Sequence, residues 1–329
     1  MIKKYLLLLL ALSIQACQLP TTGLALENDE IDKAILDEIY GLNESINHAY
    51  TIGDEEFINS VWLKMIKDNP QFNKDAVALK SFFDSDYTLK HWNDYYSILS
   101  RKGNRLIYFP ADSLWTIYVN YRTEYDTTFA SFLVTEQDDY GYMFSYVYAK
   151  SLGQWKVQNC SISPFSIIGM DSNQLFYAAD SLLNMGYELP AILYLEYAAQ
   201  CSQPSQVLSY SIEDKLSEFT NKVTEQFIKK NTFPIAIPDL KLNYGIYKCT
   251  SFVSDEQINP HIYYVTNFSL IDVELIEDEM HKLVPIVEKL FPGITKISEK
   301  IIFFAFEDPP IDPSIEYSRY GRVIDLNTD

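Results

Sequence analysis

One histidine in this sequence stands close to groups that could perform acid–base chemistry. His91 is followed by Asp94 three residues later and by Tyr95 four residues later, in the segment LKHWNDYYSIL. On a helix these side chains share a face, and a carboxylate beside an imidazole can orient the ring as a general base. The alternative is an amphipathic helix on which His91 is simply a hydrogen-bonded neighbour of the core.

The remaining ionisable residues form no recognisable metal or nucleophile motif. None of the four histidines has a second histidine at a metal-ligand spacing. Acidic runs at 53–56, 136–139, 276–280 and 307–313 do not match the EF-hand pattern. The sequence also lacks the G-x-S-x-G elbow and glycine-rich phosphate loops. We therefore expect no metal and no cofactor, and the sequence favours a protein that is not an enzyme.

The chain begins with the layout of a secretory signal. Lys3 and Lys4 precede an unbroken apolar run over residues 5–12, and polar residues soon end this run. A spanning helix needs about 20 apolar residues, so the run predicts an export signal and not a membrane span. We expect residues 1–16 to be removed, which makes Cys17 the first residue of the mature protein.

The residues in front of Cys17 resemble the lipobox of bacterial lipoproteins. In that pattern a branched aliphatic residue lies three positions before the cysteine and a small residue immediately before it, here Ile14 and Ala16. Gln15 departs from the small residue usual between them. The resemblance implies a diacylglyceryl thioether and an N-acyl chain such as palmitate on Cys17, which would hold the protein on a bilayer. Ordinary cleavage before Cys17, leaving a free secreted protein, is the alternative.

The residue after the cysteine and the net charge bear on location and partners. Gln18 is not aspartate, the usual inner-membrane retention residue of enterobacterial lipoproteins. The resemblance therefore implies the outer membrane, facing the periplasm or the surface, if the organism has two membranes. The net charge of −19 becomes −21 once the leader, with two lysines and no acids, is removed. Such a surface repels phosphate backbones, so we expect no nucleic-acid partner. The expected partners are the membrane and, for an assembly role, another envelope protein.

Residue patterns predict an α+β chain built from several units. We expect a tether over 17–30, an α+β domain over 31–165, a helical hairpin region over 166–232 and a C-terminal α+β domain over 233–329. In the second unit, apolar spacing predicts helices at 31–42, 57–66, 75–83 and 89–99. Aromatic and β-branched segments divided by turns then predict an antiparallel meander, with strands at 105–109, 114–122, 127–136, 142–150 and 154–163.

Helices followed by a long curved sheet resemble the NTF2-like fold over residues 31–165. The closest likeness is the strand with the pattern G-x-W-K-V at 153–157, which follows a tight turn. The resemblance implies a cone-shaped cavity, and the residues that could line it are His91, Asp94, Tyr95 and Tyr118.

The second half of the chain predicts a helical hairpin and a small sheet. Residues 172–204 resemble one tetratricopeptide-type hairpin, with small Ala179, Ala191 and Ala198 where close helix crossing needs them. Solenoids need about three repeats, so we expect a helical bridge, with a peptide-binding groove as the alternative. After residue 233 the pattern predicts the order ββαββ, with a helix from Asp272 that Pro285 should kink or divide.

Three further cysteines, Cys160, Cys201 and Cys249, form no CxxC pair. The sequence is compatible with one disulfide and one remaining thiol, and equally with three buried thiols.

The sequence therefore favours a lipid-anchored cell-envelope protein that is a non-enzymatic binding or assembly module. The alternative is a small-ligand binder or enzyme that uses a cavity in the NTF2-like domain. A third possibility is glycan binding through some of the 25 tyrosines.

Overall fold

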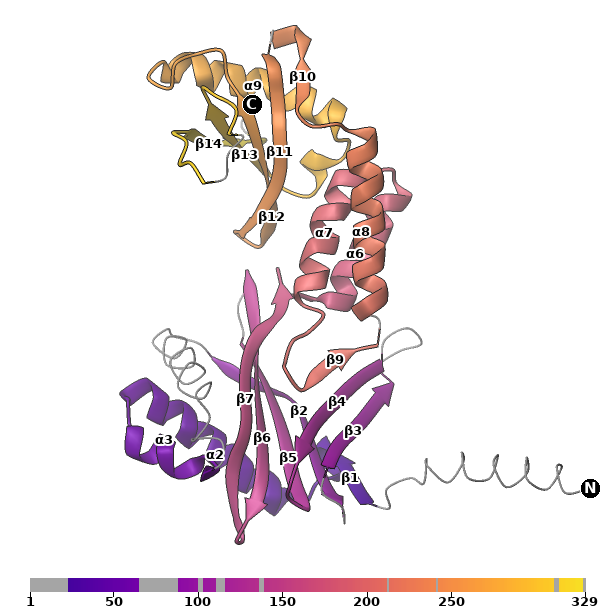
Figure 1. Cartoon of the computed structure of the whole chain (residues 1–329), viewed down its shortest axis with the longest axis vertical. Helices are drawn as coiled ribbons and strands as arrows, with labels where there is room; N and C mark the ends of the chain where they lie inside the picture. The colour runs from indigo at the N-terminus through magenta and orange to yellow at the C-terminus, as the bar shows by residue number, and fades with distance from the viewer. Residues whose placement is uncertain are drawn as a thin grey trace, which may run out of the picture.

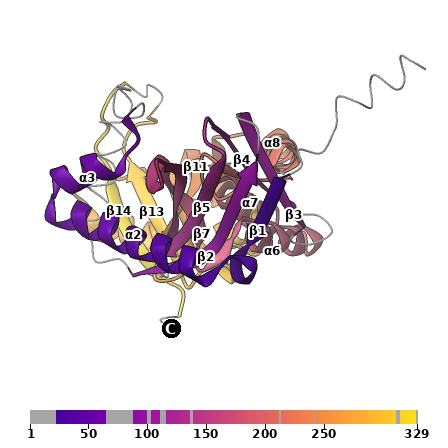
Figure 2. The same cartoon turned by 90° about the horizontal axis from the view of Figure 1, so that it is seen from below.

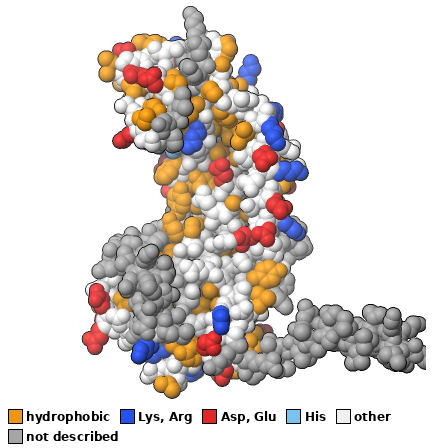
Figure 3. Space-filling view, viewed as in Figure 1, with side chains coloured by type: hydrophobic (Ala, Val, Ile, Leu, Met, Phe, Trp, Pro, Cys, Tyr) orange, Lys and Arg blue, Asp and Glu red, His pale blue; other side chains and the backbone are white. Residues whose placement is uncertain are grey.

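The computed structural model describes residues 23–64, 88–99, 103–110, 116–135, 139–211, 213–240, 242–310 and 314–327. Within these residues the chain is α+β, as predicted. Figure 1 shows an elongated molecule with a lower lobe of sheet and helices, a middle layer of helices and an upper lobe that contains the C-terminus. On the face seen in Figure 3, acidic and basic side chains are interspersed with hydrophobic ones along the whole length.

A strongly curled, fully antiparallel six-stranded sheet forms the lower lobe. Its strand order is β1-β2-β5-β6-β7-β8. The strands are β1 (Gly23–Glu27), β2 (Leu89–Leu99), β5 (Thr127–Thr135), β6 (Tyr140–Ser151), β7 (Gln154–Ile167) and β8 (Met170–Asp171). The central strands are buried on both faces, and six consecutive residues of β5, from 128 to 133, are buried. Apolar residues are therefore needed on both sides of the sheet.

One face of this sheet is covered by α2 (Lys33–Ile52) and α3 (Glu55–Val61) (Figure 2). Asp32 caps α2 by accepting a hydrogen bond from the Ala34 amide at 2.8 Å. The helix ends at Gly53, whose φ of 72° is a left-handed conformation that glycine adopts without strain. The apolar stripe of α2 packs against aromatic side chains of β5, β6 and β7.

The opposite face is covered by a smaller sheet and the helical layer. The smaller sheet contains β3 (Gly103–Pro110), β4 (Thr116–Thr123) and β9 (Leu208–Tyr210). The helices are α6 (Ser172–Asn184), α7 (Glu188–Gln200) and α8 (Glu213–Lys230). Helix α7 is buried nearly all round, with eight buried residues, because it packs between the lower sheet, its neighbouring helices and the upper lobe.

The upper lobe is a five-stranded sheet with one helix, α9 (Val273–Leu290), across one face. Its strands are β10 (Ile235–Ile237), β11 (Leu242–Ser254), β12 (Gln257–Val265), β13 (Lys300–Phe306) and β14 (Tyr320–Asp325). Strands β12 and β13 are parallel, because α9 carries the chain back across the sheet between them. The predicted ββαββ order is found in β11, β12, α9, β13 and β14, but a short strand that was not predicted, β10, precedes it. Pro285 does not divide α9.

Several other predictions are confirmed. Helices form where α2, α3, α6 and α7 were expected, and strands β3 to β7 match the five segments of the predicted meander. These five strands do not form one sheet, however, because β3 and β4 leave the main sheet and pair with β9. Within the predicted helical hairpin region, a third helix, α8, follows the hairpin.

Two further predictions are wrong. Residues 89–99 form strand β2 and not a helix, since aromatic residues on both faces of this segment, Tyr95 and Tyr96, are buried in the two layers that cover the sheet. Within the predicted tether, Gly23–Glu27 form β1, which pairs with β2 along the edge of the main sheet. The helix expected at 75–83 and the apolar residues Met65 and Ile66 lie outside the described residues, as does Cys17.

Candidate functional site

The predicted histidine site lies on a strand, and a β-bulge brings its residues to one face. The register between β2 and β5 shifts after His91, and Trp92 is the extra residue. On a regular strand, residues three apart point to opposite faces, but one extra residue returns them to the same face. His91 and Asp94 therefore both face α2, with His91 Nδ1 3.7 Å from Asp94 Oδ2.

Asp94 is a buried hydrogen-bond acceptor between the sheet and α2. The Tyr40 hydroxyl donates to Asp94 Oδ2 at 2.7 Å, and the Ser131 hydroxyl donates to Oδ1 at 2.7 Å. Ser131 accepts from Asn43 Nδ2 at 3.0 Å, and Asn43 Oδ1 accepts from the Tyr148 hydroxyl at 2.5 Å. This chain of hydrogen bonds joins α2 to β2, β5 and β6.

Burial shifts the titration of both members of the pair. Asp94 is 2% exposed, and desolvation raises the pKa of its carboxyl, against the hydrogen bonds from Ser131 and Tyr40. Desolvation lowers the pKa of the His91 imidazole, against the attraction of Asp94 and Glu44. The His91 ring lies on the Tyr40 ring, with centroids 3.7 Å apart. Since both oxygens of Asp94 already accept hydroxyl donors, this carboxylate chiefly holds α2 on the sheet.

The two predicted tyrosines lie away from this pair. Tyr95 is fully buried in the core on the opposite face of β2. Tyr118 lies on β4 in the smaller sheet, where it pairs with Ser209. The structure thus brings His91 and Asp94 together but does not arrange all four predicted residues around one cavity.

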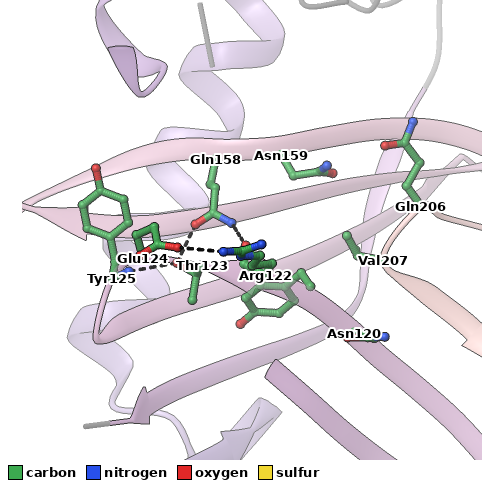
Figure 4. Close-up of a pocket in the computed structure, with 10 residues that line it drawn as sticks. Asn120, Arg122, Thr123, Glu124, Tyr125, Gln158, Asn159, Gln206 and Val207 are labelled. Carbon is green, nitrogen blue, oxygen red and sulfur yellow. Dashed lines mark hydrogen bonds and ion pairs between the residues drawn. The ribbon is translucent and has the colours of Figure 1, made fainter. Parts of the chain in front are cut away.

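A pocket of about 520 Å³ lies on the face of the main sheet opposite His91, where β4, β7 and the loop before β9 meet (Figure 4). Strand β9 pairs with β4 only over residues 117–119, and the pocket opens along the following residues of β4. Four amide side chains from three segments line it, namely Asn120, Gln158, Asn159 and Gln206.

A second β-bulge places two of these amides. In the β6–β7 ladder Val157 and Asn159 have partners on β6, and Gln158 is the extra residue between them. Gln158 and Asn159 consequently point to the same side of the sheet. Gln158 Oε1 accepts from the Thr123 hydroxyl at 2.6 Å, and its Nε2 donates to the Arg122 carbonyl at 2.5 Å. This side chain therefore bridges the two sheets at the end of the pocket.

Three serine hydroxyls hold the loop before β9 against the main sheet. Ser205 donates to Ser145 at 2.7 Å, and Ser145 lies 2.7 Å from Ser161, oxygen to oxygen. The backbone N–H of Gln206 donates to Ser161 Oγ at 3.3 Å, and the backbone N–H of Val207 donates to Ser205 Oγ at 3.1 Å. Gln206 is therefore carried on a backbone that buried polar contacts fix in place.

A buried arginine holds the turn on the other side of the pocket. Arg105 is 1% exposed and donates from Nη2 to the carbonyls of Tyr125 and Asp126, at 2.8 and 3.5 Å. Burial lowers the pKa of its guanidinium. These bonds fix the β4–β5 turn that carries Glu124 and Tyr125 into the pocket lining.

Most residues that line the pocket have polar side chains, and their charges balance. Its charged residues among the described ones are Arg122 and Glu124, which pair with each other across 3.7 Å. Asn159 Oδ1 is buried, and no described residue donates a hydrogen bond to it. The pocket thus offers amide donors and acceptors, one unused acceptor and tyrosine rings, which suits a polar uncharged ligand.

Gln158 and Asn159 were predicted to lie in a strand but were not among the predicted site residues. A signal was available, because Trp155, Val157 and Cys160 all pack toward α2, at a spacing of two and then three. Apolar residues normally recur at every second position of such a strand, and here two adjacent amides interrupt that period. A bulge produces this pattern.

Other candidate groups do not gather into a site. Cys160, Cys201 and Cys249 lie on separate elements, and none of them forms a disulfide within the described residues. Among the described residues, no three His, Cys, Asp or Glu side chains lie close enough together to hold a metal ion. In the acidic run at 53–56, Asp54 caps α3 by accepting from the Phe57 amide at 3.0 Å.

None of the helices in the described ranges combines the length and the apolar composition needed to cross a membrane. No protein-family model, no curated protein and no solved structure matches this chain.

Proposed function

We propose that this chain is a lipid-anchored cell-envelope protein that acts as a non-enzymatic binding module. Acyl chains on Cys17 would anchor it, and the ligand would occupy the pocket between β4 and β7. The lipobox resemblance before Cys17 supports the anchor, and Gln18 favours the outer membrane in a double-membrane organism. A second envelope protein is the partner that an assembly role would require.

The pocket is the observation that carries the binding role. Its volume of about 520 Å³ falls within the range of small-molecule sites. The groups in its lining that could react are already engaged, since the Thr123 hydroxyl donates to Gln158 and the Glu124 carboxylate pairs with Arg122. These contacts favour recognition over catalysis.

We also infer that the lower lobe is an NTF2-like domain and that α6 and α7 form one tetratricopeptide-type hairpin. The first inference is supported by helices that precede a strongly curled antiparallel sheet. Ala179, Ala191 and Ala198, all fully buried at the contacts of the two helices, support the second. Because α7 is buried nearly all round, the hairpin serves as a bridge between the lobes.

Native mass spectrometry of the full-length protein, extracted from its own membrane in mild detergent, tests the proposal. The expected mass is that of residues 17–329 with acyl chains, together with a small ligand or a stoichiometric second protein. A Cys17→Ser variant should lose the acyl mass and the membrane fraction, while the matched Cys249→Ser variant should keep both. An unmodified cleaved chain from the wild-type protein would overturn the anchor.

The enzymatic alternative rests on His91 and is tested separately. The pocket and His91 lie on opposite faces of the main sheet, so a His91→Gln variant should retain any ligand that the wild-type protein carries. Loss of the ligand from this variant, in protein that unfolds at the wild-type temperature, would favour a site built around His91.

A further inference from the structure

We propose that the pocket between β4 and β7 recognises a neutral saccharide, a ligand class that rests on the binding function proposed above. The lining excludes other classes first. Arg122 and Glu124 neutralise each other, so the site offers neither an anion nor a cation an unpaired counter-charge. An apolar ligand would leave the Asn159 acceptor without a donor, and an unsatisfied buried polar group costs about 1–3 kcal/mol.

The amides point to hydroxyl groups in particular. An amide offers both donors and an acceptor, and a hydroxyl can donate and accept at once, so vicinal hydroxyls match amide side chains well. The four amides come from β4, β7 and the loop before β9, so residues of three separate segments line the pocket (Figure 4). This arrangement suits a compact polyol, whereas an extended peptide presents its N–H and C=O groups along one edge.

Asn159 supplies the sharpest contact of the proposed site. Its Oδ1 accepts no hydrogen bond from the described residues, and it lies in the wall of the pocket. Rotation of the amide about its Cβ–Cγ bond would turn this acceptor toward a ligand hydroxyl. A ligand that donates there gains a hydrogen bond that the free protein lacks, so binding should depend on this residue.

The tyrosine beside the amides fits the same ligand. Tyr125 is half-buried in the lining, on the turn that Arg105 holds in place. A tyrosine ring presents an apolar face and a hydroxyl, and the C–H face of a sugar ring can stack on such a surface. Amides around the rim and one aromatic ring together provide both kinds of contact that a pyranose offers.

Saturation-transfer NMR and calorimetry on the mature protein without its leader test this inference. The probes are glucose, galactose, mannose, N-acetylglucosamine, maltose, cellobiose and chitobiose, each at millimolar concentration, with an uncharged tetra-alanine amide as the peptide probe. At least one saccharide should bind. Asn159→Ala and Gln206→Ala should each weaken that binding about 5-fold or more, which is the loss of one hydrogen bond.

Two controls keep the experiment decisive. Gln206 is exposed, so its replacement should leave the thermal midpoint unchanged even if Asn159→Ala destabilises the sheet. The matched Asn184→Ala variant removes an exposed amide on α6, outside the pocket, and should bind as the wild type does. Binding of tetra-alanine alone would overturn the saccharide class while leaving the binding function in place. Two results would overturn this inference. One is saccharide binding that Asn159→Ala and Gln206→Ala leave unchanged, and the other is the absence of saccharide binding.

Discussion

At the level of single residues, folding takes the carboxylate of Asp94 almost completely out of water. Two hydroxyl donors replace its hydration, one from α2 and one from β5. On the side of the β1–α2 turn, the Asp94 backbone amide donates to Asn28 Oδ1 at 3.0 Å, and Asn28 Nδ2 donates to Asn93 Oδ1 at 2.5 Å. Asn28 has a φ of 46°, a conformation that asparagine tolerates better than most residues. Asp94 thus ties three elements together.

Removing one of these donors should weaken the attachment of α2. We expect Tyr40→Phe to lower the free energy of unfolding by about 1 kcal/mol, because the buried carboxylate loses a charge-assisted hydrogen bond. Urea unfolding measures the change. Tyr177→Phe on α6 is the control, since this exposed tyrosine should be neutral. Equal stability of the two variants would mean that water replaces the Tyr40 hydroxyl without loss.

Burial of His91 and Asp94 also affects how His91 binds a proton. His91 should titrate below its ordinary pKa of 6.5, because desolvation favours the neutral imidazole. The folded protein then binds this proton less readily than the unfolded chain, so His91 lowers stability as the pH falls through 6.5. In Asp94→Asn the pKa of His91 should fall further, since the attracting carboxylate is gone. NMR titration, assigned with His91→Gln, measures both values, and a rise in the Asp94→Asn variant would contradict the argument.

At the level of elements, two β-bulges set which side chains meet. The extra residue in β2 is Trp92 and the extra residue in β7 is Gln158, and each bulge turns polar side chains toward a chosen face. On either side of Gln158, Val157 and Cys160 both pack toward α2. Deleting Gln158 would therefore leave a regular strand with every apolar side chain on its original face.

Deletion of single residues from β7 tests this account. We expect deletion of Gln158 to reduce the free energy of unfolding by less than about 2 kcal/mol, because the register of the core is kept. Deletion of its near neighbour Lys156 should be far more damaging, since it turns Val157 or Trp155 to the wrong face. Denaturant unfolding compares the two. If both deletions reduced the free energy of unfolding by similar amounts, the bulge would not determine which face the side chains of β7 occupy.

Local residue patterns were enough to predict some of these elements but not others. Strands β3 to β7 and the helices of the hairpin were predictable because apolar period and turn residues agree locally. Strand β2 was not, because burial on both faces removes the alternation that marks a strand, and LKHWNDYYSIL fits a helix equally well. His91 and Asp94 were predicted to share a face for the wrong reason, since a bulge and not a helix brings them together.

The pocket depended on information that lies outside any local pattern. Asn120 and Gln206 are 86 positions apart in the chain and meet only because β9 returns to pair with β4. Composition gives no sign of that pairing, because β9 is three residues long. Only the adjacent amides Gln158 and Asn159 left a trace in the sequence, as a break in the two-residue period.

At the level of the whole molecule, one apolar core runs from the lower sheet to the upper lobe. Buried residues of β5, α7, β12 and α9 belong to a single contact cluster. Polar contacts add to it, since the Glu256 amide donates to Asp139 Oδ1 at 2.7 Å and Lys230 pairs with Glu188 at 2.9 Å. The helical layer is therefore a shared core between the lobes and not a flexible linker.

This continuity predicts one cooperative unfolding transition. All four tryptophans lie within residues 62–155, so tryptophan fluorescence reports the lower lobe, whereas far-ultraviolet circular dichroism also reports α6 to α9. The two thermal transitions should coincide. In Gly293→Ala they should separate, because an added Cβ would lie 2.3 Å from the Tyr187 ring at the contact of the helical layer with the upper lobe. Separate transitions in the wild-type protein would contradict a shared core.

Strand β1 has a consequence for the proposed anchor. It begins at Gly23, only six residues after Cys17, and it is hydrogen-bonded into the edge of the main sheet. A fully extended chain advances by about 3.3–3.6 Å per residue, so the segment between an acylated Cys17 and β1 would be at most about 20 Å long. The lower lobe and its pocket would therefore stay within the layer of solvent next to the bilayer. The reach of the molecule beyond that layer would come from its own length, with the upper lobe at the far end from β1 (Figure 1).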